Sequence, residues 1–160
     1  MAVNEEYPHY SLPYHIILEL IYKLCTGERS RFKKTALKMV AGIHPPVHYL
    51  GLENVPTQGS FLVTLNYYSR KGFLIAWAAA AITAVMPRDP VWMMTGAWTS
   101  RKGGWDSVRT AVTKRIFKRI AEVYGFVTTP PMPPAKEELM DRMLSIRKLI
   151  GILENQPDPI

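Results

Sequence analysis

Two adjacent cations, Arg70 and Lys71, lie in a short polar stretch that could bind an anion. The apolar segment 61–65 precedes this stretch, and the Ala-rich segment 73–86 follows it. The first segment has the length of a strand and the second that of a helix, so the polar stretch is predicted to be the turn between them. A turn at the carboxyl end of a strand, in front of a helix N-terminus, favours phosphate groups. The alternative interpretation is that both cations are solvated surface charges.

The composition favours a folded, basic protein. The chain has 160 residues, 48% of them hydrophobic, which is enough for the core of one domain and excludes a disordered chain. With 20 Lys and Arg against 13 Asp and Glu, the net charge is +7. This charge favours an anionic partner, either nucleic acid, a membrane surface or a phosphorylated substrate. Nucleic acid is the least favoured of the three, because no basic segment shows the aromatic and basic interleaving of a known module.

The remaining composition predicts a protein of a reducing compartment without a metal. The single cysteine, Cys25, cannot form an intramolecular disulfide, and none of the four histidines lies in a ligand pair. The segment 1–10 lacks the features of a signal peptide. The two most apolar segments, 12–24 and 73–86, are shorter than the roughly 20 residues that span a bilayer. We therefore expect a cytoplasmic protein, peripheral to a membrane and without a transmembrane span.

Two amphipathic helices are predicted in an N-terminal segment, residues 1–44. Apolar residues recur at helical spacing in 12–24 and in 30–41, and Lys and Arg residues occupy the opposite face of the second helix. Together they form a basic helical hairpin. Either this hairpin packs on a core with a solvated basic face, or it contacts an anionic membrane, since both produce the same pattern.

An α/β domain with a mostly parallel sheet and crossover helices is predicted for residues 45–160. Its centre is a pair of buried parallel strands, 61–65 and 91–95, joined by the helix 73–86, whose Ala-rich part allows close approach to the sheet. Further elements are short strands at 47–50 and 126–128, a helix from Asp106 or Ser107 to Tyr124, and a helix at 135–155. A helix that leaves a parallel sheet normally leads to another strand, so we expect this domain to lack its C-terminal strands.

From residue 47 onward, the order of these features resembles the glycerol-phosphate and lysophospholipid acyltransferase family. The resemblance rests on Gly51-Leu52-Glu53-Asn54-Val55-Pro56, on Gly59, and on the strand 61–65 that leads into Asn66. It implies a glycerol-3-phosphate acyltransferase-like fold. It also implies transfer of an acyl group from an acyl thioester, carried by coenzyme A or an acyl carrier protein, to a glycerol-phosphate or lysophospholipid hydroxyl. No cofactor beyond this donor is implied.

The catalytic histidine and aspartate of the family's first motif are replaced by other residues in this chain. When the motif N-H-x-x-x-x-D is aligned on Asn66, the histidine falls at Tyr67 and the aspartate at Gly72. A hydroxyl that attacks a thioester needs a base, and imidazole oriented by a carboxylate suits that task near neutrality. A phenol, with a reference pKa of ~10, does not. We therefore expect little or no acyl transfer.

The resemblance also implies where a substrate would bind. Asn66 and Ser69 match the first motif, and Gly96 to Lys102 loosely correspond to the family's phosphate-holding loop. The implied substrate-binding residues are Asn66, Ser69, Arg70, Lys71, Arg101 and Lys102. Two functions remain open. The chain is either a fragmentary or inactive acyltransferase, or a non-catalytic module that binds an anionic phospholipid surface.

Overall fold

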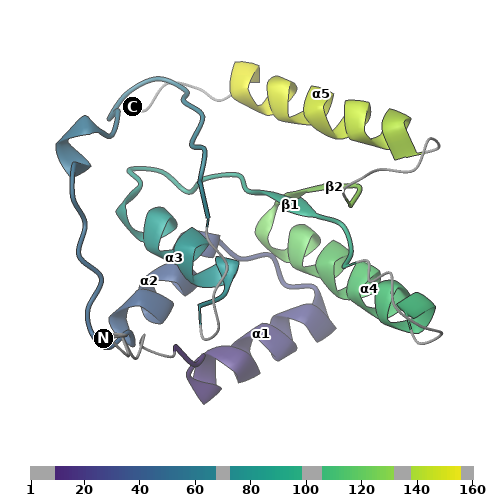
Figure 1. Cartoon of the computed structure of the whole chain (residues 1–160), viewed down its shortest axis with the longest axis horizontal. Helices are drawn as coiled ribbons and strands as arrows, with labels where there is room; N and C mark the ends of the chain where they lie inside the picture. The colour runs from purple at the N-terminus through teal and green to yellow at the C-terminus, as the bar shows by residue number, and fades with distance from the viewer. Residues whose placement is uncertain (1–9, 68–72, 99–105, 132–137, 156–160) are drawn as a thin grey trace, which may run out of the picture. The chain divides into compact units, whose positions relative to one another are not determined.

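The structure is a computed structural model of the chain, and it describes residues 10–67, 73–98, 106–131 and 138–155. These residues form five α-helices, one 3₁₀ helix and two short strands, so the fold is mixed α/β (Figure 1). In chain order the elements are α1 (Tyr14–Thr26), α2 (Phe32–Ala41), η1 (Leu52–Asn54), α3 (Ile75–Val85), β1 (Met93–Thr95), α4 (Asp106–Tyr124), β2 (Val127–Thr129) and α5 (Leu139–Asn155).

The chain forms two compact units. Unit 1 comprises Met1–Ile21, Arg31–Thr57 and Leu62–Pro90, and therefore contains α2, η1, α3 and most of α1. Unit 2 comprises Tyr22–Ser30, Gln58–Phe61 and Val91–Ile160, and contains both strands with α4 and α5.

The core of unit 1 is the packing of α2 against α3. Ala36 on α2 and Ala80 on α3 are fully buried, and the larger side chains of Phe32, Met39 and Trp77 are buried with them. Small residues such as alanine let two helix backbones approach closely, while the larger side chains fill the space around them. The prediction that the Ala-rich segment forms a helix is confirmed. Its packing partner is α2 and not a strand.

The turn after α3 also holds the beginning of α2. The backbone N–H of Lys33 donates to Asp89 Oδ1 at 3.0 Å, and Lys33 Nζ donates to the carbonyl oxygens of Met86 at 2.5 Å and Pro87 at 3.4 Å. Arg31, the residue before α2, supplies no side-chain cap. Asp89 therefore provides, from a distant part of the chain, the carboxylate that stabilises a helix N-terminus.

The two predicted N-terminal helices are confirmed as α1 and α2, with shifts of about two residues at their ends. Their packing differs from that of a simple hairpin. Within unit 1, α2 packs on α3, and an ion pair of 2.5 Å between Lys38 Nζ and Glu19 Oε2 connects α2 to α1. The basic face of α2 is consequently engaged in part with α1 and with the turn after α3.

Unit 2 is organised by the parallel pair β1 and β2. Met93 lies opposite Val127, Met94 opposite Thr128 and Thr95 opposite Thr129. Beyond β2, the N–H of Gly96 donates to the carbonyl of Thr129 at 2.7 Å, which extends the ladder by one residue. The helix α4 connects the two strands, as a parallel pair requires. Both α4 and α5 contact β2, and Figure 1 shows the strands between these two helices.

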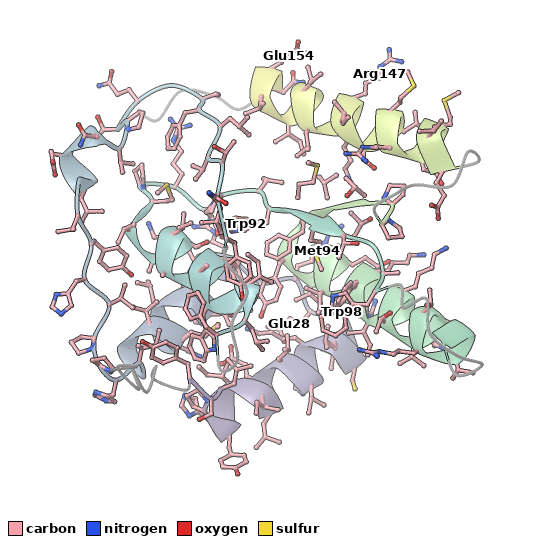
Figure 2. All side chains as sticks on the ribbon, viewed as in Figure 1. Glu28, Trp92, Met94, Trp98, Arg147 and Glu154 are labelled. Atoms are coloured by element: carbon pink, nitrogen blue, oxygen red, sulfur yellow. The ribbon has the colours of Figure 1, made fainter. Side chains whose placement is uncertain are left out.

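The exposed side of α5 points away from the strands. Arg147 and Glu154 are exposed on this side, as Figure 2 shows. On the opposite side, Ser145 Oγ lies 2.8 Å from the carbonyl oxygen of Thr128 in β2. The predicted helix 135–155 is therefore confirmed from Leu139 onward.

The predicted strands at 61–65 and 47–50 are wrong. Neither segment is a strand in the structure, and Leu62 is 78% exposed where a buried side chain was expected. The partner of β1 is β2, which corresponds to the strand predicted at 126–128, and α4 is the crossover helix in place of α3. A strand exists only when a second strand satisfies its hydrogen bonds, and β1 finds that partner at the other end of α4. The apolar character of 61–65 did not indicate which segment would pair with β1.

Because α2 and α3 approach closely, the effect of a larger side chain on stability should depend strongly on its position in α3. Ala80→Leu should lower the free energy of unfolding by about 1–3 kcal/mol, because the larger side chain forces the two helices apart. Ala76→Leu makes the same change at an exposed position of α3 and should alter it by less than about 0.5 kcal/mol. Urea unfolding followed by circular dichroism measures both variants, and equal losses would contradict the packing described above.

Candidate functional site

Two of the predicted site residues lie in the part of the chain that the structure describes. Asn66 is exposed and Tyr67 is half-buried. The others lie outside the described residues: Ser69, Arg70, Lys71, Gly72, Arg101 and Lys102. The substrate site implied by the resemblance therefore stays a prediction, and only the surroundings of Tyr67 can be described.

Tyr67 belongs to an aromatic cluster at the beginning of α3. Its ring lies 5.9 Å from that of Phe73, and its hydroxyl donates a hydrogen bond to the backbone carbonyl of Phe73. The ring of Tyr10 lies 5.9 Å from Phe73 and 5.8 Å from Trp77. Such offset and tilted pairs are favourable beyond the area that they bury. In this arrangement the hydroxyl of Tyr67 links the end of one described range of the chain to the beginning of the next.

The same hydrogen bond bears on chemistry at Tyr67. A general base must accept a proton from the attacking group, whereas the phenol here donates its own proton to a carbonyl oxygen. In the part of the chain that the structure describes, the phenol of Tyr67 therefore acts as a hydrogen-bond donor. The position that corresponds to the family histidine thus has a structural role in the residues described.

Tyr49 and Cys25 are two further described side chains that could do chemistry. Burial raises the pKa of the Tyr49 hydroxyl above its ordinary value of 10.0, and its oxygen is buried without a hydrogen-bond partner. Tyr49 is therefore neutral at physiological pH. Cys25 is exposed. Within the described ranges, no group of three or more His, Cys, Asp or Glu side chains is placed to hold a metal ion.

An exposed apolar face on α1 is the candidate binding surface of unit 1. This face, called here the α1 face, consists of Tyr14, Leu18 and Ile21, which are 86%, 67% and 50% exposed. Their spacing of four and three residues places them on one side of the helix. The neighbouring Tyr22 is also 59% exposed, whereas Ile16 on the other side of the helix is buried.

Sequence reasoning missed the α1 face. The apolar residues whose helical spacing predicted one core-facing side in 12–24 include Ile16 and Ile21, but the structure buries the first and exposes the second. The signal that could have revealed the face is that α1 is apolar on nearly all sides, interrupted only by His15, Glu19 and Lys23. A helix of this kind has more apolar surface than one core contact can cover.

Exposed cations lie on α2, in the same unit as the α1 face. Lys34 and Lys38 are four residues apart on the exposed side of α2, with the exposed Leu37 between them. The ion pair between Lys38 and Glu19 fixes this side of α2 next to α1. An apolar helical face with cations beside it can contact a surface that is apolar inside and anionic at its boundary.

Comparison of the chain with protein-family models, with curated proteins and with solved structures finds no match. In the described part of the chain, no helix is long and apolar enough to cross a membrane. The features of the molecule that bear on its function are the α1 face, the distribution of charge and the surroundings of Tyr67.

The contrast between two tyrosines in unit 1 gives a prediction about stability. Tyr67→Phe should lower the free energy of unfolding by about 1 kcal/mol, because the carbonyl of Phe73 loses its donor. Tyr49→Phe should leave it unchanged or raise it, because this change removes a buried hydroxyl that has no partner. Chemical denaturation of the two variants tests the contrast. A larger loss for Tyr49→Phe than for Tyr67→Phe would contradict it.

Proposed function

We propose that the protein is a peripheral membrane-binding protein, which contacts anionic lipid surfaces through the α1 face and does not catalyse acyl transfer. The observation that carries this proposal is the exposure of Tyr14, Leu18 and Ile21 on one side of α1. An amphipathic helix with such a face lies in the plane of the membrane interface and buries the face at the boundary of headgroups and acyl chains.

The energetics of the α1 face favour a lipid interface over water. Full burial of a Leu or Ile side chain contributes about 1.5–3 kcal/mol, so partial burial of Leu18 and Ile21 is favourable even after losses from ordering. Tyrosine is suited to the interface because its ring is apolar and its hydroxyl stays in contact with headgroups. Tyr14, at the beginning of α1, can occupy this position.

Charge supplies the preference for anionic lipid. A lysine near an anionic membrane surface contributes about 1 kcal/mol, and the effect decreases within a Debye length. Lys34 is an exposed cation on α2, whereas the exposed Lys38 beside it already forms an ion pair with Glu19, so Lys34 and the net charge of +7 supply this preference. The alternative, in which the basic face is merely solvated, leaves the exposure of the α1 face unexplained.

Vesicle binding should depend on the α1 face. We expect the protein to sediment with vesicles that contain anionic lipid, less with neutral vesicles, and less at high salt. Leu18→Glu should reduce the partition coefficient between vesicles and water at least about tenfold, since it places a charge in the part of the α1 face that the membrane would bury. Leu50→Glu makes the same change at an exposed residue of unit 1 outside α1 and should have little effect. Equal sedimentation with neutral and anionic vesicles, or equal losses in the two variants, would overturn the proposal.

Catalysis is predicted to be absent or very weak. A general base typically contributes ~10²–10⁴-fold to such a reaction, and the chain has Tyr67 and Gly72 where the family has its histidine and aspartate. We expect no consumption of acyl-coenzyme A above the uncatalysed rate when lysophosphatidate is the acceptor. The variant Tyr67→His/Gly72→Asp, assayed in parallel, tests whether the histidine and aspartate of the family motif restore turnover. Robust turnover by the unchanged protein would refute the prediction.

A further inference from the structure

Unit 2 contains a pocket of about 530 Å³, which is separate from the α1 face. Ligand pockets for small molecules have volumes of ~300–1,000 Å³, so this one is large enough for such a ligand. Three parts of the chain supply its polar side chains: Arg29 in the loop after α1, Lys118 and Glu122 on α4, and Ser145 and Lys148 on α5. The turn and strand at 125–128 complete the wall.

The charge of this pocket is positive and is not balanced by its own residues. Arg29, Lys118 and Lys148 are exposed, and none of them has a hydrogen bond or ion pair among the described residues. Glu122, the acidic residue of the lining, already accepts a hydrogen bond of 3.1 Å from Arg119 Nη1. Three cations thus face the pocket against one carboxylate that has its own partner.

Backbone contacts hold the parts that carry these cations. The N–H of Ser30 donates to the carbonyl of Val123 at 2.9 Å, and Arg119 Nε donates to the carbonyl of Leu24 at 2.8 Å, so the loop with Arg29 is attached to α4. On the other side, the hydroxyl of Ser145 attaches α5 to β2. Cations from three separate elements therefore converge, which differs from the periodic solvated face of a single helix.

Apolar side chains line the remainder of the pocket. Val127 and Ala121 are buried, being 3% and 8% exposed, and Leu144 and Phe126 lie in the same lining. The ring of Phe126 stacks on Tyr124 at 5.5 Å, which fixes its orientation. A ligand that fits both parts needs an anionic group and an apolar body.

We propose that this pocket binds a phosphorylated small molecule with an apolar body. Its phosphate would lie among Arg29, Lys118 and Lys148, and its apolar part against Leu144 and Phe126. A tetrahedral dianion can accept charge-assisted hydrogen bonds from several directions, and its two charges match three lining cations better than the single charge of a planar carboxylate does. This site uses none of the residues that the acyltransferase resemblance implies. The same group could come from a free metabolite or from a lipid headgroup.

Titration calorimetry with octyl phosphate, kept below its micelle concentration, tests the pocket in the full chain. We expect saturable binding of one molecule, weaker binding of inorganic phosphate, and no binding of the neutral octyl glucoside. Lys118→Gln and Lys148→Gln should each weaken octyl phosphate binding roughly three- to tenfold. Lys114→Gln, at an exposed residue of α4 outside the lining, should leave it unchanged. The absence of saturable binding, or equal losses in all three variants, would overturn the proposal.

Two further variants separate this site from the α1 face. Leu18→Glu should retain octyl phosphate binding. A loss of binding confined to that variant would overturn the proposal that the pocket binds the ligand, and would assign the ligand to the α1 face. With vesicles that contain phosphatidate, the double variant Lys118→Gln/Lys148→Gln is compared with Lys114→Gln/Arg115→Gln. A greater loss in the pocket variant supports a headgroup as the source of the phosphate, and equal sedimentation supports a free ligand. Failure of the membrane proposal would leave the calorimetric result unchanged.

Discussion

The parallel pairing of β1 and β2 is the constraint on which unit 2 depends. Parallel strands cannot be joined by a tight turn, so α4 must run the length of the pair before the chain returns as β2. Gly125, with φ of 71°, ends α4 in the left-handed conformation that turns the chain into the strand. With only two strands of three residues to pack on, α4 and α5 keep much apolar surface exposed, including Val108, Ile116, Met143 and Ile150.

Sequence patterns predicted the helices well because each helix carries its own signal. Four of the five α-helices follow segments of helical periodicity and α3 follows an Ala-rich segment too long for a strand, and the largest shift at an end that the structure describes is two residues. Of the predicted strands, those at 91–95 and 126–128 are confirmed as β1 and β2, and those at 47–50 and 61–65 are wrong. A segment such as 61–65 can have the composition of a buried strand and still lack a partner, since pairing depends on parts of the chain far away. The same limit explains why the Ala-rich helix was expected on a sheet but packs on α2.

The candidate site shows a comparable division. Residue types alone indicated that Tyr67 is a poor substitute for a histidine, and the structure adds that its hydroxyl is bonded to Phe73. The exposure of the α1 face had a signal in the nearly all-round apolar character of α1, but no sequence pattern could have indicated the Tyr67 bond or the convergence of Arg29, Lys118 and Lys148. Both depend on how separate parts of the chain pack together within one unit.

The net charge of the chain overstates the charge that is free to act on a partner. Lys33 donates to the carbonyls at the end of α3, Lys23 donates to Ser30 Oγ at 3.0 Å while it is only 6% exposed, and Arg119 donates to Leu24. These cations stabilise the fold, so binding must rest on others.

Arg119 also restricts which residues position 27 can hold. Gly27 ends α1 with φ of 77°, and a Cβ at this position would lie 2.6 Å from Arg119 Nη2. A side chain at position 27 would be strained in its backbone and would displace the guanidinium from Leu24. Position 27 is therefore under two separate constraints, and a shorter residue at position 119 would remove the steric one while the left-handed backbone would still disfavour any side chain.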